Sequence, residues 1–204
     1  MVSTATQQAA GAIAAFSRMR EGILLILAAW VLLGVGSLSL VATVLLSVFG
    51  LENVGFTSAA PGIILLTLVL LVVGAIVGIV GFYFKFIPGV SELARTDPRF
   101  STARTLIKVG YVWGLILVIV GTPLLLVLVG LFVLAIGFVL LLLGYIGIIV
   151  LSFKLNEAYP NTLYIVAAVL FIVSIVFPLA GVVSWVLLYV ALGDTIGKLR
   201  AQVT

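Results

Sequence analysis

Cysteine and histidine are absent from this chain of 204 residues, and charged residues are scarce. Without cysteine the chain forms no disulfide and offers no thiolate nucleophile, and without histidine it lacks the commonest metal ligand. Charged residues make up 8% of the sequence, hydrophobic residues make up 65%, and the mean hydropathy is +1.50. Soluble domains carry roughly 25% charged residues. The chain has too little polar surface to face water, so we expect an integral membrane protein.

The few charges are clustered, which leaves four stretches without any: 22–51, 53–84, 109–153 and 158–193. Each stretch is longer than the roughly 20 apolar residues that a helix needs to cross a bilayer core. The third stretch would reach about 68 Å as one straight helix, more than twice the core thickness, so the chain must turn back within it. Gly121, Pro123 and Gly130 place that turn between residues 121 and 131.

The last stretch is long for one span and short for two. As one helix, residues 162–193 would reach about 48 Å and would need a tilt outside the usual range. Divided near Pro178, they give two helices of about 16 residues, each near the lower limit for crossing. With six spans all ten Lys and Arg residues lie on one side, whereas five spans would leave Lys198 and Arg200 on the other. Six spans therefore agree better with the excess of basic residues that cytoplasmic loops carry.

The sequence thus predicts an all-α, polytopic transmembrane helix bundle of six spans arranged as three hairpins. It would be a multi-pass protein of the cell membrane with both termini in the cytoplasm. Residues 1–21 are expected to form an N-terminal tail or an interfacial helix, and residues 22–200 a single transmembrane domain. The expected spans are about 23–49, 62–84, 107–127, 131–153, 162–177 and 179–194. Aromatic residues gather near their cytoplasmic ends, as in an interfacial belt.

Glycines recur at helical spacings along the expected spans. Gly130, Gly137 and Gly144 are seven residues apart, which places them on one face of a helix. In lipid there is little hydrophobic force between helices, so small residues stabilise packing by allowing close backbone approach. We expect helix-packing contacts, with a helix of the same chain or of another subunit, at Gly74, Gly78, Gly110, Gly114, Gly130, Gly137 and Gly144.

Small hydroxyl residues share one face of the first span, at Ser39, Thr43 and Ser47. One interpretation is the lining of a pore or substrate path. The other, which we favour, is that these hydroxyls bond to carbonyls of their own helix and permit close packing.

Basic residues dominate the longest polar stretch, at Arg95, Arg99, Arg104 and Lys108. These side chains would contact anionic lipid headgroups or an acidic partner, or they would serve only to orient the chain in the membrane. The sequence favours neither interpretation.

Ionisable residues are missing from the depth of every expected span. Ion-coupled transporters usually place such groups there, and intramembrane hydrolysis needs paired carboxylates, a metal site or an activated nucleophile. We therefore predict no enzyme activity, no catalytic residue, no metal and no cofactor. The favoured function is that of a non-catalytic accessory or structural subunit. It would pack in the lipid against other membrane-protein subunits or as a homo-oligomer, without nucleic acid. The alternative is a small channel or facilitator with a Ser/Thr-lined path.

Several segments resemble an uncharacterised archaeal family of multi-span membrane proteins, known only as a domain of unknown function. The matching segments are Glu21-Gly22, Asp97 to Phe100, Leu155 to Thr162 and Leu187 to Gly193. The resemblance covers nearly the whole chain. It implies an archaeal membrane origin and supplies no activity and no functional residue.

Overall fold

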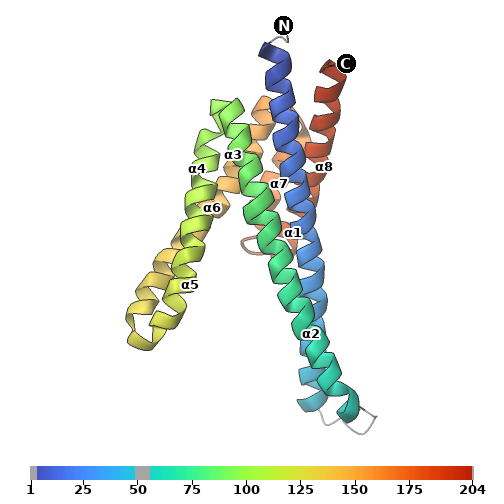
Figure 1. Ribbon diagram of the computed structural model, residues 1–204, viewed down its shortest axis with the longest axis vertical. Helices are drawn as coiled ribbons and strands as arrows, with labels where there is room; N and C mark the ends of the chain where they lie inside the picture. Colours follow the sequence, from blue (N-terminus) through green and yellow to red (C-terminus); the bar gives the residue numbers. More distant parts are fainter. Residues whose placement is uncertain (1–3, 49–55, 204) are drawn as a thin grey trace.

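The computed structural model describes residues 4–48 and 56–203, and all of the regular structure in these ranges is helical. Three hairpins stand side by side, with both chain ends at the same end of the molecule (Figure 1). In the first hairpin, α1 (Thr4–Val48) is followed by α2 (Phe56–Ile79). The second leg continues without a break through the π-helix η2 (Val80–Phe86) into α3 (Ile87–Thr96).

The second hairpin begins at a short 3-10 turn, η3 (Pro98–Phe100), where the Asp97 carboxylate accepts a hydrogen bond from the Arg99 backbone N–H at 3.0 Å. Its first leg runs through α4 (Ser101–Lys108), the π-helix η4 (Val109–Trp113) and α5 (Gly114–Leu124). The chain reverses at η5 (Leu125–Val127) and at Leu128, whose φ of 58° is left-handed. The return leg is α6 (Val129–Ala158).

The third hairpin is the shortest. α7 (Thr162–Val173) begins at Asn161, whose side-chain oxygen accepts a hydrogen bond from the Leu163 N–H at 3.1 Å and so caps the helix. The chain turns before Pro178, and α8 (Pro178–Val203) returns beside α1 to the end where the chain began.

The prediction of an all-α polytopic bundle folded as three hairpins is confirmed. In the described part of the chain, five helical legs are long and apolar enough to cross a membrane, not the six that the sequence predicts, because the expected span 162–177 holds only the twelve-residue α7. The chain is a multi-pass membrane protein. Residues 4–21 form no separate tail or surface helix, because α1 runs through them without a break. The polar stretch from Lys85 to Lys108 is helical too, and its buried residues follow helical spacing.

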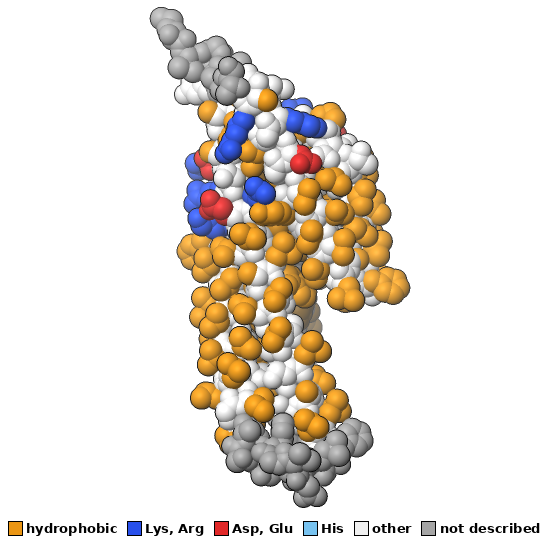
Figure 2. Space-filling view, turned by 90° about the vertical axis from the view of Figure 1, so that its right-hand side faces the viewer, with side chains coloured by type: hydrophobic (Ala, Val, Ile, Leu, Met, Phe, Trp, Pro, Cys, Tyr) orange, Lys and Arg blue, Asp and Glu red, His pale blue; other side chains and the backbone are white. Residues whose placement is uncertain are grey.

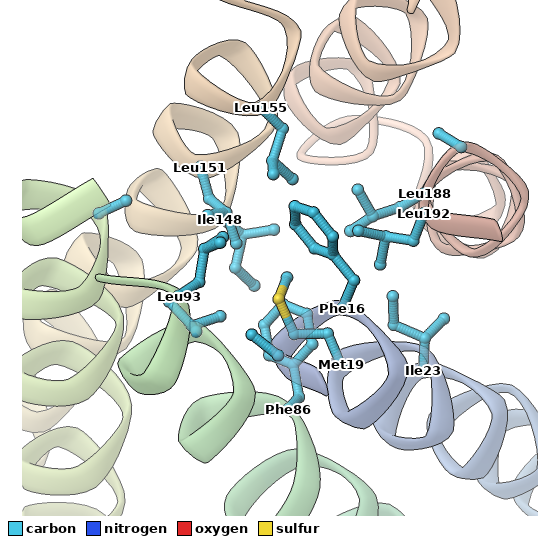
Figure 3. Packing of buried hydrophobic residues seen from close by; sticks show 14 of the residues in the cluster. Phe16, Met19, Ile23, Phe86, Leu93, Ile148, Leu151, Leu155, Leu188 and Leu192 are labelled. Carbon is cyan, nitrogen blue, oxygen red and sulfur yellow. The ribbon is translucent and has the colours of Figure 1, made fainter. Parts of the chain in front are cut away.

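A single hydrophobic core joins the three hairpins at the polar end of the molecule. Side chains from α1, η2, α3, α6 and α8 converge in it, as Figure 3 shows for Phe16, Met19, Phe86, Leu151 and Leu188. The helices α3 and α4 are amphipathic and cover this core with Leu93 and Ile107. Lys, Arg, Asp and Glu side chains gather at the same end, whereas hydrophobic side chains predominate over the remaining described surface in this view (Figure 2). We call this end the polar end.

Away from the polar end the first two hairpins diverge (Figure 1). No extended contact joins α2 to α5 or α6 in the described part of the chain. Their apolar side chains are largely exposed, with Leu65 at 64%, Leu66 at 60% and Phe138 at 57%. Exposed apolar side chains of this kind cost nothing when the solvent is lipid. We call the space between the α1–α2 and α5–α6 hairpins the wedge.

The third hairpin ends far short of the other two (Figure 1). The twelve residues of α7 rise about 18 Å, against a bilayer core of about 30 Å. Its turn is apolar and exposed, with Val176 at 73% and Phe177 at 66%. The N–H groups of residues 174–177 all donate to backbone carbonyls, as a turn in a water-free medium requires. We therefore expect this hairpin to enter the membrane only partway.

Cysteine labelling tests the depth of the third hairpin, since the chain has no cysteine of its own. A Phe177→Cys variant should resist membrane-impermeant thiol reagents added from either face, because its thiol lies in lipid. A Gln202→Cys variant, at the polar end, should react from one face. Reaction of Phe177→Cys from the face opposite to Gln202→Cys would show that the hairpin crosses the whole membrane.

Candidate functional site

An aromatic cluster lies where the three hairpins part. Phe82 of η2 meets Tyr111 of η4 with ring centroids 4.5 Å apart. Trp185 of α8 lies edge-on to both Phe86 and Phe171, at 5.2 Å in each case. Edge-to-face pairs of this kind stabilise by about 0.5–1.5 kcal/mol each. We call this cluster the aromatic apex; its members are Phe82, Phe86, Tyr111, Tyr145, Phe171 and Trp185.

The two π-helices bring the first and second hairpins together at the apex. The Tyr83 hydroxyl of η2 donates to the Tyr111 carbonyl of η4 at 3.1 Å. Within η4 the same carbonyl also accepts from the Gly114 backbone N–H, so the tyrosine hydroxyl is a second donor to it. The Tyr83 hydroxyl therefore links the two hairpins and gives this carbonyl a donor from the neighbouring hairpin.

Tyr145 of α6 links the second hairpin to the third by a hydrogen bond. Its hydroxyl donates to the Phe171 carbonyl at 2.8 Å and also contacts the Ser174 hydroxyl. The Ser174 hydroxyl donates to the same carbonyl at 2.7 Å. The last carbonyls of a helix have no partner within the helix, so these hydroxyls allow α7 to end inside an apolar medium.

Two adjoining cavities open beside the apex, and together we call them the crevice. One has a volume of 470 Å³ and is lined by Leu33, Gly74, Ala75 and Ile79 besides aromatic rings. The other has a volume of 360 Å³ and reaches Leu142, Ser174 and Pro178. Both are bordered by Trp30, Tyr145 and Trp185. Their lining contains no charged residue, so the crevice suits apolar or aromatic groups: a neighbouring helix's side chains or a lipid tail.

The glycines of the second hairpin all face the partner leg. Gly110 and Gly144 lie backbone to backbone, and a methyl group on Gly114 would come within 2.9 Å of Leu141. Gly130 sits against the backbone of Leu124 and Leu125 at the turn, whereas Gly137 faces Leu117 and Val118, 3.1–3.2 Å from where its Cβ would be. The structure brings these residues together in one intrachain seam between α4–α5 and α6.

The first hairpin packs in the same way. Gly74 faces Leu32 and Leu33, and Gly78 faces Ala29, each at 3.1–3.2 Å from the would-be Cβ. Ser39 of α1 lies in this interface as well.

Ser39 Oγ is 2.9 Å from Thr67 Oγ1 of α2, and the Thr43 hydroxyl donates to the Ser39 carbonyl at 2.8 Å. Neither Ser39 nor Thr43 lines one of the described cavities. The side chain of Ser47 lies outside the described side chains.

The four basic candidates lie together at the polar end but differ in their partners. Arg99 pairs with Asp97, with an Nη2–Oδ2 distance of 2.6 Å, and this hydrogen-bonded guanidinium holds the pKa of the Asp97 carboxyl below its usual value. Arg95 is exposed and borders a shallow cavity of 260 Å³. Among the described residues, Arg95, Arg104 and Lys108 have no carboxylate within ion-pair distance.

The sequence predicts an interfacial belt of aromatic residues, yet three of them, Phe82, Phe86 and Tyr111, are members of the apex, and Tyr83 packs edge-on against Phe82. The predicted belt does not include the other three members, Tyr145, Phe171 and Trp185. Their spacing from the other apex residues along the chain carries no signal, because the apex joins five separate elements. The amphipathic helices α3 and α4 could have been predicted from the sequence, because their buried apolar residues recur at helical spacing: Val90 and Leu93 in α3, and Ala103 and Ile107 in α4.

These features define a polytopic helical membrane protein whose three hairpins share one core at the polar end. The chain belongs to the family described as "Protein of unknown function (DUF973)", whose model matches residues 12–204. That description names neither a source nor a membrane location, so the archaeal origin stays a prediction. No curated protein and no solved structure matches the chain.

Glycine-to-alanine variants test the seam of the second hairpin. In Gly110→Ala the new methyl group would overlap the backbone of Gly144, so we expect a loss of about 1–3 kcal/mol and a lower melting temperature in detergent. Gly34→Ala is the matched control, because nothing lies within 4 Å of its would-be Cβ. In the control, alanine should stabilise the helix by about 0.5–1 kcal/mol. Equal melting temperatures for the two variants would contradict the seam.

Proposed function

We propose that this protein is a non-catalytic membrane subunit that works by associating with an apolar transmembrane helix, from a second copy or from another protein. The wedge is the observation that carries this proposal. One core at the polar end holds the hairpins, while their distal halves present apolar faces that no part of the described chain covers. A partner helix in the wedge would contact α2 on one side and the α5–α6 hairpin on the other.

The glycine seams are already occupied by helices of the same chain, which leaves the wedge as the surface for a partner. Close helix contact in lipid depends on small residues, and the predicted packing glycines already face neighbours within the chain. A partner therefore has to use the wider surface between the hairpins. The crevice at the head of the wedge, with Trp30 and Trp185 on its rim, offers aromatic side chains of the kind that dominate protein interfaces.

The channel alternative rests on the hydroxyl face of α1, and no observation favours it. The hydroxyls of Ser39 and Thr43 form hydrogen bonds within the first hairpin. They therefore do not need water from a solute path as a hydrogen-bond partner. A solute path along this face would need α1 and α2 to separate.

The basic residues at the polar end indicate how the chain is oriented in the membrane. The Lys and Arg side chains that Figure 2 shows gather at this end, and both termini lie there as well (Figure 1). Because basic residues are retained in the cytoplasm, we place the polar end and both chain ends on the cytoplasmic side of the cell membrane.

Labelling of single cysteines from each side of the membrane tests this orientation. Thr102→Cys, on the exposed face of α4, and Gln202→Cys should react only in permeabilised cells, because the cytoplasm encloses them. Ser58→Cys, near the predicted outer loop, should react in intact cells. The reverse pattern would invert the topology.

A matched pair of tryptophan variants tests association through the wedge. Leu68 and Leu66 of α2 are both exposed, at 51% and 60%. Leu68 shares the helix face of Ala75 and Ile79, which line the crevice, whereas Leu66 lies on roughly the opposite face. Native mass measurement after extraction in mild detergent should show wild-type particles of defined stoichiometry. Leu68→Trp should reduce the associated fraction at least about tenfold, equivalent to about 1.4 kcal/mol, and Leu66→Trp should leave it unchanged.

The same measurement identifies the partner, since a homo-oligomer and a complex with another protein differ in mass. A wild-type protein that is wholly monomeric, or an equal effect of the two tryptophans, would contradict association through the wedge. A monomer that also passes a solute into liposomes would favour the channel alternative.

A further inference from the structure

Arg20 lies at the boundary between the polar end and the membrane-facing part of α1. It precedes Glu21 and the charge-free stretch that begins at Gly22. Its guanidinium carbon is 4.3 Å from the centre of the Tyr189 ring on α8. A side chain on Gly193, one turn further along α8, would meet this guanidinium at 3.3 Å. The lack of a side chain at Gly193 therefore leaves room for Arg20 between the two helices.

The Arg20 charge has no counter-ion in the described part of the chain. No carboxylate lies within 4.0 Å of it, and its Nε is buried without a hydrogen-bond acceptor. The neighbouring Glu21 is engaged elsewhere, by Lys85 of η2 at 2.7 Å. A partly buried cation without an acceptor is costly, and the ring of Tyr189 offsets only part of that cost.

A cavity of 120 Å³ opens beside the guanidinium, lined by Ser17, Arg20, Glu21, Leu24 and Tyr189. Next to this cavity, α1 and α8 present exposed apolar side chains. Leu24 and Val31 follow Arg20 at helical spacing and are 53% and 64% exposed, and Val186 and Val190 of α8 are 42% and 43% exposed. An anion in this cavity would lie beside the Arg20 guanidinium and the Ser17 hydroxyl, with apolar surface next to it. The Glu21 carboxylate also lines the cavity, and its charge is balanced by Lys85.

We propose that Arg20, Ser17 and Tyr189 form a binding site for the phosphate of a membrane-lipid headgroup. The planar guanidinium presents paired N–H donors that match two phosphate oxygens, and the Ser17 hydroxyl offers a further donor. The acyl chains would lie along Leu24 and Val31. A free phosphate would satisfy the same donors, but it would leave this apolar surface unused. The site lies on the α1–α8 side of the molecule and does not depend on association through the wedge.

Native mass spectrometry of the delipidated protein in detergent tests the site, with bound lipid counted per protomer. The ligand is phosphatidylglycerol, and the reference is a neutral galactosyl diacylglycerol without phosphate. Arg20→Gln should weaken phosphatidylglycerol binding about tenfold and leave the weak binding of the neutral lipid unchanged. Arg95→Gln is the matched control, since Arg95 is exposed and does not border this cavity.

A second variant keeps the charge and fills the cavity. Ser17→Phe should lose phosphatidylglycerol binding as Arg20→Gln does, while Arg20→Lys should keep part of it. The melting temperature without lipid shows which variants are folded, and only these are compared. Equal losses in Arg20→Gln and Arg95→Gln would mean that lipids bind the basic surface as a whole, and would overturn the site. Displacement of the lipid by millimolar inorganic phosphate would overturn the lipid assignment, because the ligand would then be the free anion.

Discussion

One core of buried apolar side chains at the polar end joins the three hairpins, and the part of it that lies outside the charge-free stretches is stabilised by removal from water. Phe16 of α1, Leu93 of α3 and Leu155 of α6 are fully buried and lie on the polar side of the first charged residue of their membrane segments. Removing a side chain of this size from water stabilises by about 1.5–3 kcal/mol. Deeper in the membrane lipid replaces water, so burial contributes little and close packing has to hold helices together. The hairpins accordingly share a core at one end and diverge at the other.

Below the core, backbone hydrogen bonding limits what the chain can do. An unpaired carbonyl in lipid costs several kcal/mol, yet the chain has π-helices and an apolar turn in the membrane part of the structure. The hydroxyls of Tyr83 and Tyr145 donate to carbonyls at these places. Each tyrosine also joins two hairpins, so hydrogen bonding and assembly of the aromatic apex depend on the same side chains.

Two parts of the described surface lack a partner within the chain. In the wedge, apolar faces of α2 and α6 have no protein partner among the described residues, and the surrounding lipid or a partner helix has to cover them. Beside α8, the cation of Arg20 has no acceptor. The wedge needs a partner of complementary shape, whereas Arg20 needs a partner of opposite charge. We therefore propose a helix as the ligand of the wedge and a lipid phosphate as the ligand of Arg20.

The sequence by itself determined the helical class, the membrane solvent, the three hairpins and the gathering of basic residues at one end. All of these follow from local quantities: the length of charge-free stretches, helical spacing and the positions of charges. It also placed the glycines on packing faces, since a seven-residue spacing fixes a face. It did not tell which neighbour each face meets.

The tertiary structure decided the remaining features. It showed that α7 is too short to cross alone, that the Ser39 hydroxyl meets Thr67 of α2, and that Tyr111, Phe171 and Trp185 belong to one apex. It also left Arg20 beside Tyr189 without a carboxylate. These contacts join residues from separate helices, and in a chain with 65% hydrophobic residues almost any helix face can be apolar. The composition therefore shows that the chain lies in lipid. Which side chains come together in a site depends on how the helices pack.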